Sequence, residues 1–402
     1  MVNESARDIA TPPGQGGLAA RIGSGRAFPD LAARIGARLA RFTGRPFRFG
    51  ATVIAARYAD VAAVLARDLD FLVAPVNAAR IEAVNGPFVL GMDRGPVLER
   101  SRRALYSALA AVDQAALAAA AAADVDAILN TGTRHDAVGG YARIVAGNTA
   151  QRLFGIGGAD QPLFRDAVRA IFAHIFLNIG GDTVVAARAL AASTLMRGWF
   201  DTEIARRRAT ASLGDDMMGQ LLRQQIVDDA GVRQTLGGML VGSIDTTAGC
   251  AARVLMVMAQ DADLRRRAAL AASDPALLHA YCQEALRLWP HNPFLLRQAA
   301  HATTLAGVRI DAGDRVIVWT QAAMQDRAVF PEPRRMLPDR DPHAYLHLGG
   351  GLHRCAGRAI DAWQLPLLVG GLLARDYAID GAPAWAGPFP DHLPIRLKGA
   401  GS

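Results

Sequence analysis

The stretch Tyr345–Arg358, YLHLGGGLHRCAGR, decides the fold of this chain. It places three consecutive glycines and a cysteine directly before an apolar segment that predicts a helix from about residue 358 to 373. Gly349 and Gly351 allow the backbone to turn tightly and to approach something flat and bulky. Cys355 lies a few residues ahead of the predicted helix, where N–H groups and the positive end of the helix dipole favour a thiolate. The stretch therefore predicts a glycine-rich loop that holds a ligating cysteine.

Such a thiolate suits a haem iron as axial ligand, because it pushes electron density onto the iron and favours O–O cleavage. The residues alone leave three other interpretations open. In the first, Cys355 is simply a small buried hydrophobic residue, as we expect of Cys250 and Cys282 on apolar helices. In the second, the glycines bind a phosphate, although no Lys-Ser/Thr pair follows them. In the third, His343, His347, His353 and Cys355 form a zinc site, although their spacing fits no familiar zinc pattern.

Composition excludes several classes of protein. The 402 residues are 51% hydrophobic, which excludes a disordered chain, and three cysteines cannot cross-link so long a chain. The formal net charge is +7, and 43 of the 44 basic residues are arginines scattered along the chain, so we expect no nucleic-acid surface. Neither an uncharged apolar run of about 18 residues nor a signal sequence is found, so we expect no membrane span and a cytoplasmic location.

The pattern along the chain predicts a mainly α protein with a small β region in its last third. Residues 1–25 are expected to form a flexible arm and residues 26–402 a single domain. Residues 70–95, rich in glycine and proline, are expected to form an irregular apolar loop. Strands are expected within 45–57 and 294–320, and helices at 58–66, 98–129, 137–155, 161–178, 184–208, 215–225, 232–259, 275–288 and 358–373.

The long predicted helix carries an unusual polar motif at 242–247, Gly-Ser-Ile-Asp-Thr-Thr. Gly242 and Thr246 are four residues apart, so the threonine hydroxyl can bond the glycine carbonyl and open the helix locally. Asp245, beside Thr246, adds an acid to that hydroxyl, and the two groups together suit a proton relay. In isolation this motif is a weak indication of function.

A second motif is Glu284-Ala-Leu-Arg287, whose charged ends meet on one helix face. Glu-x-x-Arg occurs five times in the chain, starting at residues 4, 99, 203, 284 and 332, and most such pairs are surface ion pairs. Only Glu284 is followed by Pro290 three residues after its arginine and by Arg297 ten residues after it.

Together, these motifs resemble those of the cytochrome P450 family. The haem loop of that family, F-G-x-G-x-H-x-C-x-G, is similar to the first stretch, in which a leucine replaces the phenylalanine. Residues 242–247 resemble its oxygen-activation motif, with Ser243 in place of the second glycine. Glu284 and Arg287 resemble its K-helix pair, and Arg340 matches the arginine that completes a Glu-Arg-Arg network. The matching loop positions are Leu348, Gly349, Gly351, His353, Cys355 and Gly357.

The resemblance implies a role for each of these positions. Cys355 would ligate the iron of haem b (iron protoporphyrin IX), and His353, Arg297 and Arg102 would hold the haem carboxylates. Leu98 stands where the family has an aromatic residue or histidine, so one carboxylate contact is missing or is supplied by Arg100. The resemblance further implies that the haem loop is braced by Glu284, Arg287 and Arg340, and that protons reach O2 through Asp245 and Thr246.

The implied activity is that of a soluble bacterial monooxygenase acting on a largely apolar small molecule. Electrons would come from a separate ferredoxin- or flavodoxin-type donor, towards which the positive charge would steer an acidic protein. Two alternatives are a peroxide-dependent peroxygenase or isomerase and a non-catalytic haem sensor or carrier. The expected pocket residues are Phe71, Leu72, Phe88, Leu90, Phe172, Phe176, Leu240, Ser243, Phe294, Leu295, Leu296, Trp385 and Phe389.

Overall fold

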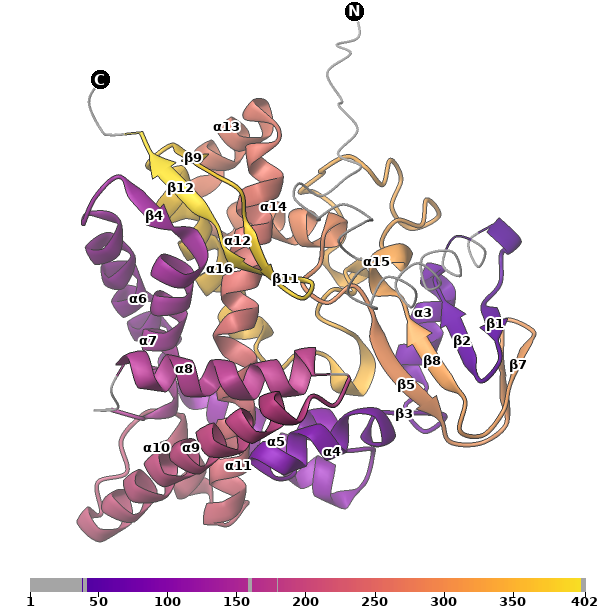
Figure 1. The fold of residues 1–402 in the computed structure, drawn as a ribbon, viewed down its shortest axis with the longest axis horizontal. Helices are drawn as coiled ribbons and strands as arrows, with labels where there is room; N and C mark the ends of the chain where they lie inside the picture. Colours follow the sequence, from indigo (N-terminus) through magenta and orange to yellow (C-terminus); the bar gives the residue numbers. More distant parts are fainter. Residues whose placement is uncertain (1–37, 39–41, 158–160, 179, 399–402) are drawn as a thin grey trace, which may run out of the picture. The chain divides into compact units, whose positions relative to one another are not determined.

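The computed structural model describes residues 38, 42–157, 161–178 and 180–398 (Figure 1). The chain divides into two compact units, each built from separate stretches of sequence. The first unit contains Met1–Leu72 and Arg253–Cys355, and the second contains Val73–Ala252 and Ala356–Ser402. The expected arm, 1–25, lies outside the described residues, and the single-domain organisation stays a prediction.

The first unit is built around a five-stranded sheet with the order β1-β2-β8-β5-β3. Only β2 and β8 run parallel, with Val53 opposite Val316, and the other pairs are antiparallel. β-branched residues fit these short, half-buried strands, and Val53, Val316 and Phe71 lie in one buried core. The strands, with the separate hairpin β6–β7, are β1 (Phe47–Phe49), β2 (Thr52–Ala55), β8 (Arg315–Val318), β5 (Leu295–Ala299), β3 (Phe71–Leu72), β6 (Thr303–Leu305) and β7 (Val308–Ile310).

The helices of the first unit include the one that carries Glu284. Its first turn is fixed by Asp274, whose side chain accepts hydrogen bonds from the N–H groups of Ala276 and Leu277, and by Pro275 at the first helical position. These helices and short turns are α3 (Tyr58–Ala66), α13 (Ala262–Leu270), η4 (Ala271–Ser273), α14 (Pro275–Leu288), α15 (Thr320–Ala323), η5 (Pro342–Ala344) and η6 (Gly351–His353).

The second unit is mostly helical, and its longest helix, α9, packs against α8 (Figure 1). Its helical segments are α4 (Ala74–Asn85), η1 (Val89–Gly91), α5 (Pro96–Ala111), α6 (Gln114–Leu129), η2 (Ala137–Ala142), α7 (Arg143–Phe154), α8 (Gln161–Phe172), η3 (Ala173–Leu177), α9 (Thr183–Thr210), α10 (Met217–Gln224), α11 (Asp229–Ser243) and α16 (Arg358–Leu373). α12 (Asp245–Ala259) begins in this unit and ends in the first.

Two small sheets complete the second unit, and both use the C-terminal part of the chain. One has the order β4-β12-β9, and the other is the hairpin β10–β11. Their strands have three or four residues each, too few to show an alternating pattern in the sequence. They are β4 (Arg134–Asp136), β9 (Tyr377–Ile379), β10 (Ala384–Ala386), β11 (Phe389–His392) and β12 (Pro394–Leu397).

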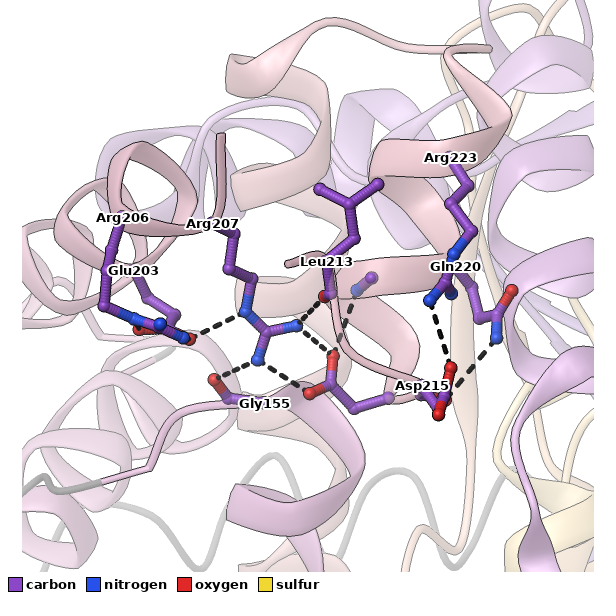
Figure 2. A network of polar contacts seen from close by, with 10 residues as sticks. Gly155, Glu203, Arg206, Arg207, Leu213, Asp215, Gln220 and Arg223 are labelled. Carbon is purple, nitrogen blue, oxygen red and sulfur yellow. Dashed lines mark hydrogen bonds and ion pairs between the residues drawn. The ribbon is translucent and has the colours of Figure 1, made fainter. Parts of the chain in front are cut away.

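Arg207 ties three helix ends of the second unit together (Figure 2). This buried arginine of α9 donates to Glu203 one turn earlier and to the carbonyl of Gly155 after α7. It also pairs with Asp216, which caps α10. The backbone carbonyl of Leu213 accepts a further hydrogen bond. One side chain therefore satisfies both carbonyls and carboxylates where α7, α9 and α10 meet.

The prediction of an irregular loop at 70–95 is wrong, because Ala74–Asn85 within it form the helix α4 and Val89–Gly91 form the short helical turn η1. Pro75 lies in the first turn of that helix, where its missing N–H removes no hydrogen bond. Gly86 ends the helix with φ +82°, and Ile81 and Val84 are buried. The helix expected at 98–129 is also divided, since Asp113 caps a new helix by accepting from the N–H of Ala116.

Among the residues that the structure describes, one helical stretch, Asp229–Ala259, is long and apolar enough to cross a membrane by length and composition. Of its apolar window, 72% is buried inside the protein, as in a core helix. The bent pair α5–α6 passes the same test only if its two helices are counted as one span.

Candidate functional site

The cysteine loop is a closed turn at the end of the first unit. The N–H of Gly349 donates to the carbonyl of Leu346 at 3.0 Å, and the N–H of Cys355 donates to the carbonyl of Leu348 at 2.9 Å. Gly349 and Gly351 have φ of +72° and +60°, which L side chains rarely adopt. A Cβ on Gly351 would lie 2.1 Å from the carbonyl oxygen of Leu65, so no other residue fits there without moving α3. The loop thus fixes the cysteine backbone before the N-terminus of α16.

Glu284 lies fully buried at the centre of a network in the same unit. Its two oxygens accept from Arg287 at 2.7 and 3.0 Å, in the paired geometry of an arginine–carboxylate contact. Arg340 adds a bond of 3.2 Å, and the N–H of Leu337 adds one of 2.9 Å. The three charged residues that the sequence pairs are therefore in contact, and their proposed function of bracing the loop stays a prediction.

Tyr345, which the sequence analysis missed, links this network to the cysteine loop. Its hydroxyl donates to Glu284 at 2.9 Å, and burial, together with the charge of Glu284, raises the pKa of the phenol. Its ring stacks on Phe330, over which the guanidinium groups of Arg287 and Arg340 lie at 5.2 and 5.8 Å. The backbone carbonyl of Leu346, the next residue along the chain, accepts the hydrogen bond from the N–H of Gly349 that closes the first turn of the loop. Only its position four residues before Gly349 could have indicated this link.

The basic residues expected to hold haem carboxylates lie on different units. In the first unit, Arg297 is buried on β5 and donates to the carbonyl of Leu296 at 2.8 Å, while His353 is half-buried in the loop. In the second unit, Arg102 lies half-buried on α5 with its guanidinium 4.9 Å from the ring of Tyr106. Tyr106, one turn after Arg102, thus supplies an aromatic partner that the leucine at position 98 does not.

The long helix is interrupted at the predicted motif. α11 ends at Ser243 and α12 begins at Asp245, with Ile244 between them at φ −90° and ψ −65°. The hydroxyl of Thr246 donates to the carbonyl of Gly242, which is the contact that their spacing predicts. Ser243 also donates, to the carbonyl of Leu240 at 2.9 Å. Side-chain hydroxyls therefore take up carbonyls that a continuous helix would bond through its backbone.

Asp245 is buried at this break with its two oxygens in different situations. Oδ1 accepts from Nε of Arg143 at 2.9 Å. Oδ2 is buried and has no hydrogen-bond partner among the described residues. Burial raises the pKa of Asp245, and the charge of Arg143 opposes the rise only in part. Asp245 is thus a carboxyl group able to carry a proton on the oxygen that Arg143 leaves open.

Arg143 does not serve Asp245 alone. Its second nitrogen, Nη2, donates to Asp391 of β11 at 3.0 Å, and Asp391 also accepts from Arg169 of α8. Burial alone would raise the pKa of Asp391, but Arg169 and Arg143 together hold it below its ordinary value. No motif marks these residues, because they lie 102 to 248 positions apart from their partners along the chain.

The structure groups some of the expected pocket residues of the second unit. Phe172 stacks on Phe176 with ring centroids 4.8 Å apart, and it contacts Phe389 at 5.6 Å. Phe88 packs on Gly238 of α11 so closely that a Cβ there would lie 2.4 Å from the ring. The other expected residues of this unit are buried or half-buried on their elements, namely Leu90, Leu240, Ser243 and Trp385.

Of the expected pocket residues in the first unit, Phe71 is fully buried in the core of the sheet, which gives it a packing role. Phe294 contacts Trp319 at 6.2 Å. Leu72, Leu295 and Leu296 are half-buried on β3 and β5. Lining a pocket stays a prediction for all of these residues.

The donor set of the loop fits a haem better than a bare metal ion. Within the described ranges, no three His, Cys, Asp or Glu side chains are grouped so that they could hold a metal ion. A haem iron needs one soft protein ligand, and Cys355 is a half-buried cysteine on a turn in which Gly349 and Gly351 both have positive φ. The residues present therefore fit a haem-thiolate site.

Comparison with known proteins gives the same result. The family model for cytochrome P450 matches residues 272–375. Mycinamicin IV hydroxylase/epoxidase of Micromonospora griseorubida is 29% identical over 79% of this chain and 80% of its own. A putative cytochrome P450 137 of Mycobacterium tuberculosis is 28% identical over 59% of this chain. The solved structure of CalO2 superimposes with a TM-score of 0.78 at 22% identity, covering 87% of this chain and 91% of that one.

The family model, the relatives and the fold together support a bacterial-type cytochrome P450. The family resemblance and the mainly α fold with a small β region are thereby confirmed, and the family implies a haem-thiolate iron. The chain spans 52% of the length of the mycobacterial relative, about half of that protein.

Proposed function

We propose that this chain is a monooxygenase that inserts one oxygen atom from O2 into a largely apolar small organic molecule. The observation that carries the proposal is the helix break, where Thr246 bonds Gly242 and a buried Asp245 keeps one oxygen open. A hydroxyl and an acid placed together in this way serve proton delivery. The name of the Micromonospora relative, a hydroxylase/epoxidase, supports the same reaction class.

When bound, haem b would supply the activation of dioxygen. Cys355 would ligate the iron through its thiolate, and His353, Arg297 and Arg102 would hold the haem carboxylates. Thr246 holds a hydroxyl proton at the break, and Asp245 replaces that proton from its open oxygen. Glu284, Arg287 and Arg340 keep the loop in place through Tyr345.

The substrate and the electron donor follow from the same residues. The phenylalanine cluster of α8, η3 and β11 offers apolar contacts, so we expect an apolar substrate. A separate ferredoxin- or flavodoxin-type protein would supply electrons, with the positive net charge favouring an acidic donor. The protein would act in the cytoplasm.

The first test concerns the ligand. The reduced carbon monoxide complex should show the strongly red-shifted Soret band of thiolate ligation, and Cys355→Ala should lose it. Cys250→Ala and Cys282→Ala, at the other two cysteines of the chain, are the matched controls and should keep the band. An unchanged band in Cys355→Ala would overturn the assignment of the ligand.

The second test concerns proton delivery. Thr246→Ala should still bind substrate and consume reductant and O2, but should release hydrogen peroxide in place of product. We expect product formed per reductant to fall at least tenfold, about 1.4 kcal/mol in the branching ratio. Thr247→Ala, the neighbouring hydroxyl, should change little. Unchanged coupling in Thr246→Ala would remove the relay, and turnover with peroxide alone would favour the peroxygenase alternative.

A further inference from the structure

Four charged side chains of the second unit form a row of alternating sign that ends at Asp245. Arg143, at the start of α7, lies between Asp245 and Asp391, at 2.9 and 3.0 Å. Asp391 of β11 in turn contacts Arg169 of α8. The side chains of Asp245 and Arg143 are 7% and 10% exposed, whereas those of Asp391 and Arg169 are 29% and 37% exposed. The row therefore runs from a buried acid to a half-exposed base.

Holding Asp245 in place requires no second carboxylate. Nε of Arg143 already donates to Oδ1, and this hydrogen bond is enough to hold the carboxylate. Asp391 accepts from Nη2 of the same guanidinium, and its negative charge partly offsets the positive charge that acts on Asp245. The open Oδ2 of Asp245 is the group whose proton affinity this offset changes.

We infer that Asp391 and Arg169, neither of which bonds Asp245, are positioning residues that set how tightly Asp245 holds its proton, acting through the shared Arg143. The inference rests on the proposed function, in which Asp245 supplies protons at the helix break. It adds two residues, on β11 and α8, to the control of that step.

The direction of each effect follows from charge. The groups facing Asp245 are Arg143 from α7, Arg169 from α8 and Asp391 from β11. Asp136 and His392 pair with each other beside Asp391, and the carboxylate of Asp136 also accepts N–H groups of η2. Removing the negative charge of Asp391 leaves the two arginines uncompensated and should make Asp245 a stronger acid. Removing the positive charge of Arg169 should make it a weaker one.

The experiment is an infrared titration of the haem-loaded protein without turnover. The C=O stretch of protonated Asp245 is assigned by its absence in Asp245→Asn and followed from about pH 4 to 9. Relative to the parent protein, Asp391→Asn should lower the midpoint and Arg169→Gln should raise it, each by roughly half a unit or more. Asp391→Glu keeps the charge and should restore the parent midpoint.

Matched controls use exposed ion pairs of the same unit. Asp124→Asn breaks the pair with Arg152, and Arg208→Gln breaks the pair with Asp229, with the same changes of charge. Neither control should move the midpoint. Midpoints of Asp391→Asn and Arg169→Gln that stay at the parent value, or that move in the same direction, would overturn the inference.

The titration separates the two proposals because it needs no substrate. A protein that never forms product from O2 would refute the proposed monooxygenase, while opposite shifts of the midpoint would still support the electrostatic control of Asp245. If the protein is active, the pH at which product per reductant falls by half should shift in the same direction as the infrared midpoint. A variant that fails to fold is replaced by Arg169→Met or Asp391→Ser, for which the same directions are expected.

Discussion

Two buried carboxylates, Glu284 in the first unit and Asp245 in the second, have opposite surroundings. Both oxygens of Glu284 are occupied, by Arg287, Arg340, the N–H of Leu337 and the hydroxyl of Tyr345. Asp245 has one occupied oxygen and one open oxygen.

The difference separates a structural acid from one that can move a proton. A carboxylate whose acceptor positions are all filled has no room for a proton without breaking a bond, so it holds chain segments together. A buried carboxylate with an open oxygen carries a proton at less cost, and burial raises the pKa of Asp245 accordingly. We therefore expect substitutions at the first acid to affect folding and substitutions at the second to affect turnover.

The largest expected effect is on the structural acid. Glu284→Ala leaves two buried arginines without their counter-charge, which costs about 3–5 kcal/mol. Urea unfolding and haem content should show an unstable, haem-poor protein. Glu332→Ala removes an exposed pair with the same Glu-x-x-Arg spacing and should stay close to the parent. A stable, haem-loaded Glu284→Ala with a new product profile would show that this acid acts in chemistry.

A smaller effect on stability is expected at the second acid. Asp245→Asn keeps the shape of the side chain, so the protein should fold and bind haem, with product per reductant falling about tenfold. The raised pKa means that the folded state holds the proton more tightly than the unfolded one. The parent should therefore lose stability relative to Asp245→Asn as pH rises from the ordinary carboxyl pKa through the folded one. A constant difference in melting temperature between the parent and Asp245→Asn across that pH range would contradict a proton held on the open oxygen of Asp245.

The sequence predicts those contacts that depend on short spacing. The bond from Thr246 to Gly242 spans one helical turn, and so does the pair of Glu284 and Arg287. Helices 58–66 and 358–373 also begin and end where the apolar pattern predicts. In each case, the residues that decide the structure lie within a few positions of one another.

The remaining features depend on residues that are distant along the chain. Arg143 is 102 residues from Asp245 and 248 from Asp391, and no local pattern relates these positions. The mistaken loop at 70–95 has a different cause, since Pro75 ends a helix when internal and starts one when in the first turn. Only the fold distinguishes the two positions.

The smallest expected effect is at Glu203, which starts another Glu-x-x-Arg pair, on α9 (Figure 2). A hydrogen bond from Arg206, together with the contact to Arg207, lowers the pKa of Glu203 to about 2 against the opposing effect of burial. The contribution of Glu203 to stability is therefore present above its unfolded pKa of about 4.3. It is lost as pH falls from there through 2.

At neutral pH, Glu203→Gln should cost about 1 kcal/mol or less, because one partner is largely exposed. The cost should vanish by about pH 2–3, where the parent glutamate is itself becoming protonated. Arg207→Gln should cost more than Arg206→Gln, because Arg207 is buried and also holds Asp216 and two backbone carbonyls. Urea unfolding of the three variants at pH 7 and pH 3 measures these differences. If Arg206→Gln lowered the free energy of unfolding as much as Arg207→Gln, the Glu-x-x-Arg spacing would matter more for stability than burial of the arginine. The expected difference between the buried Glu284 pair and the exposed Glu332 pair would then fail as well.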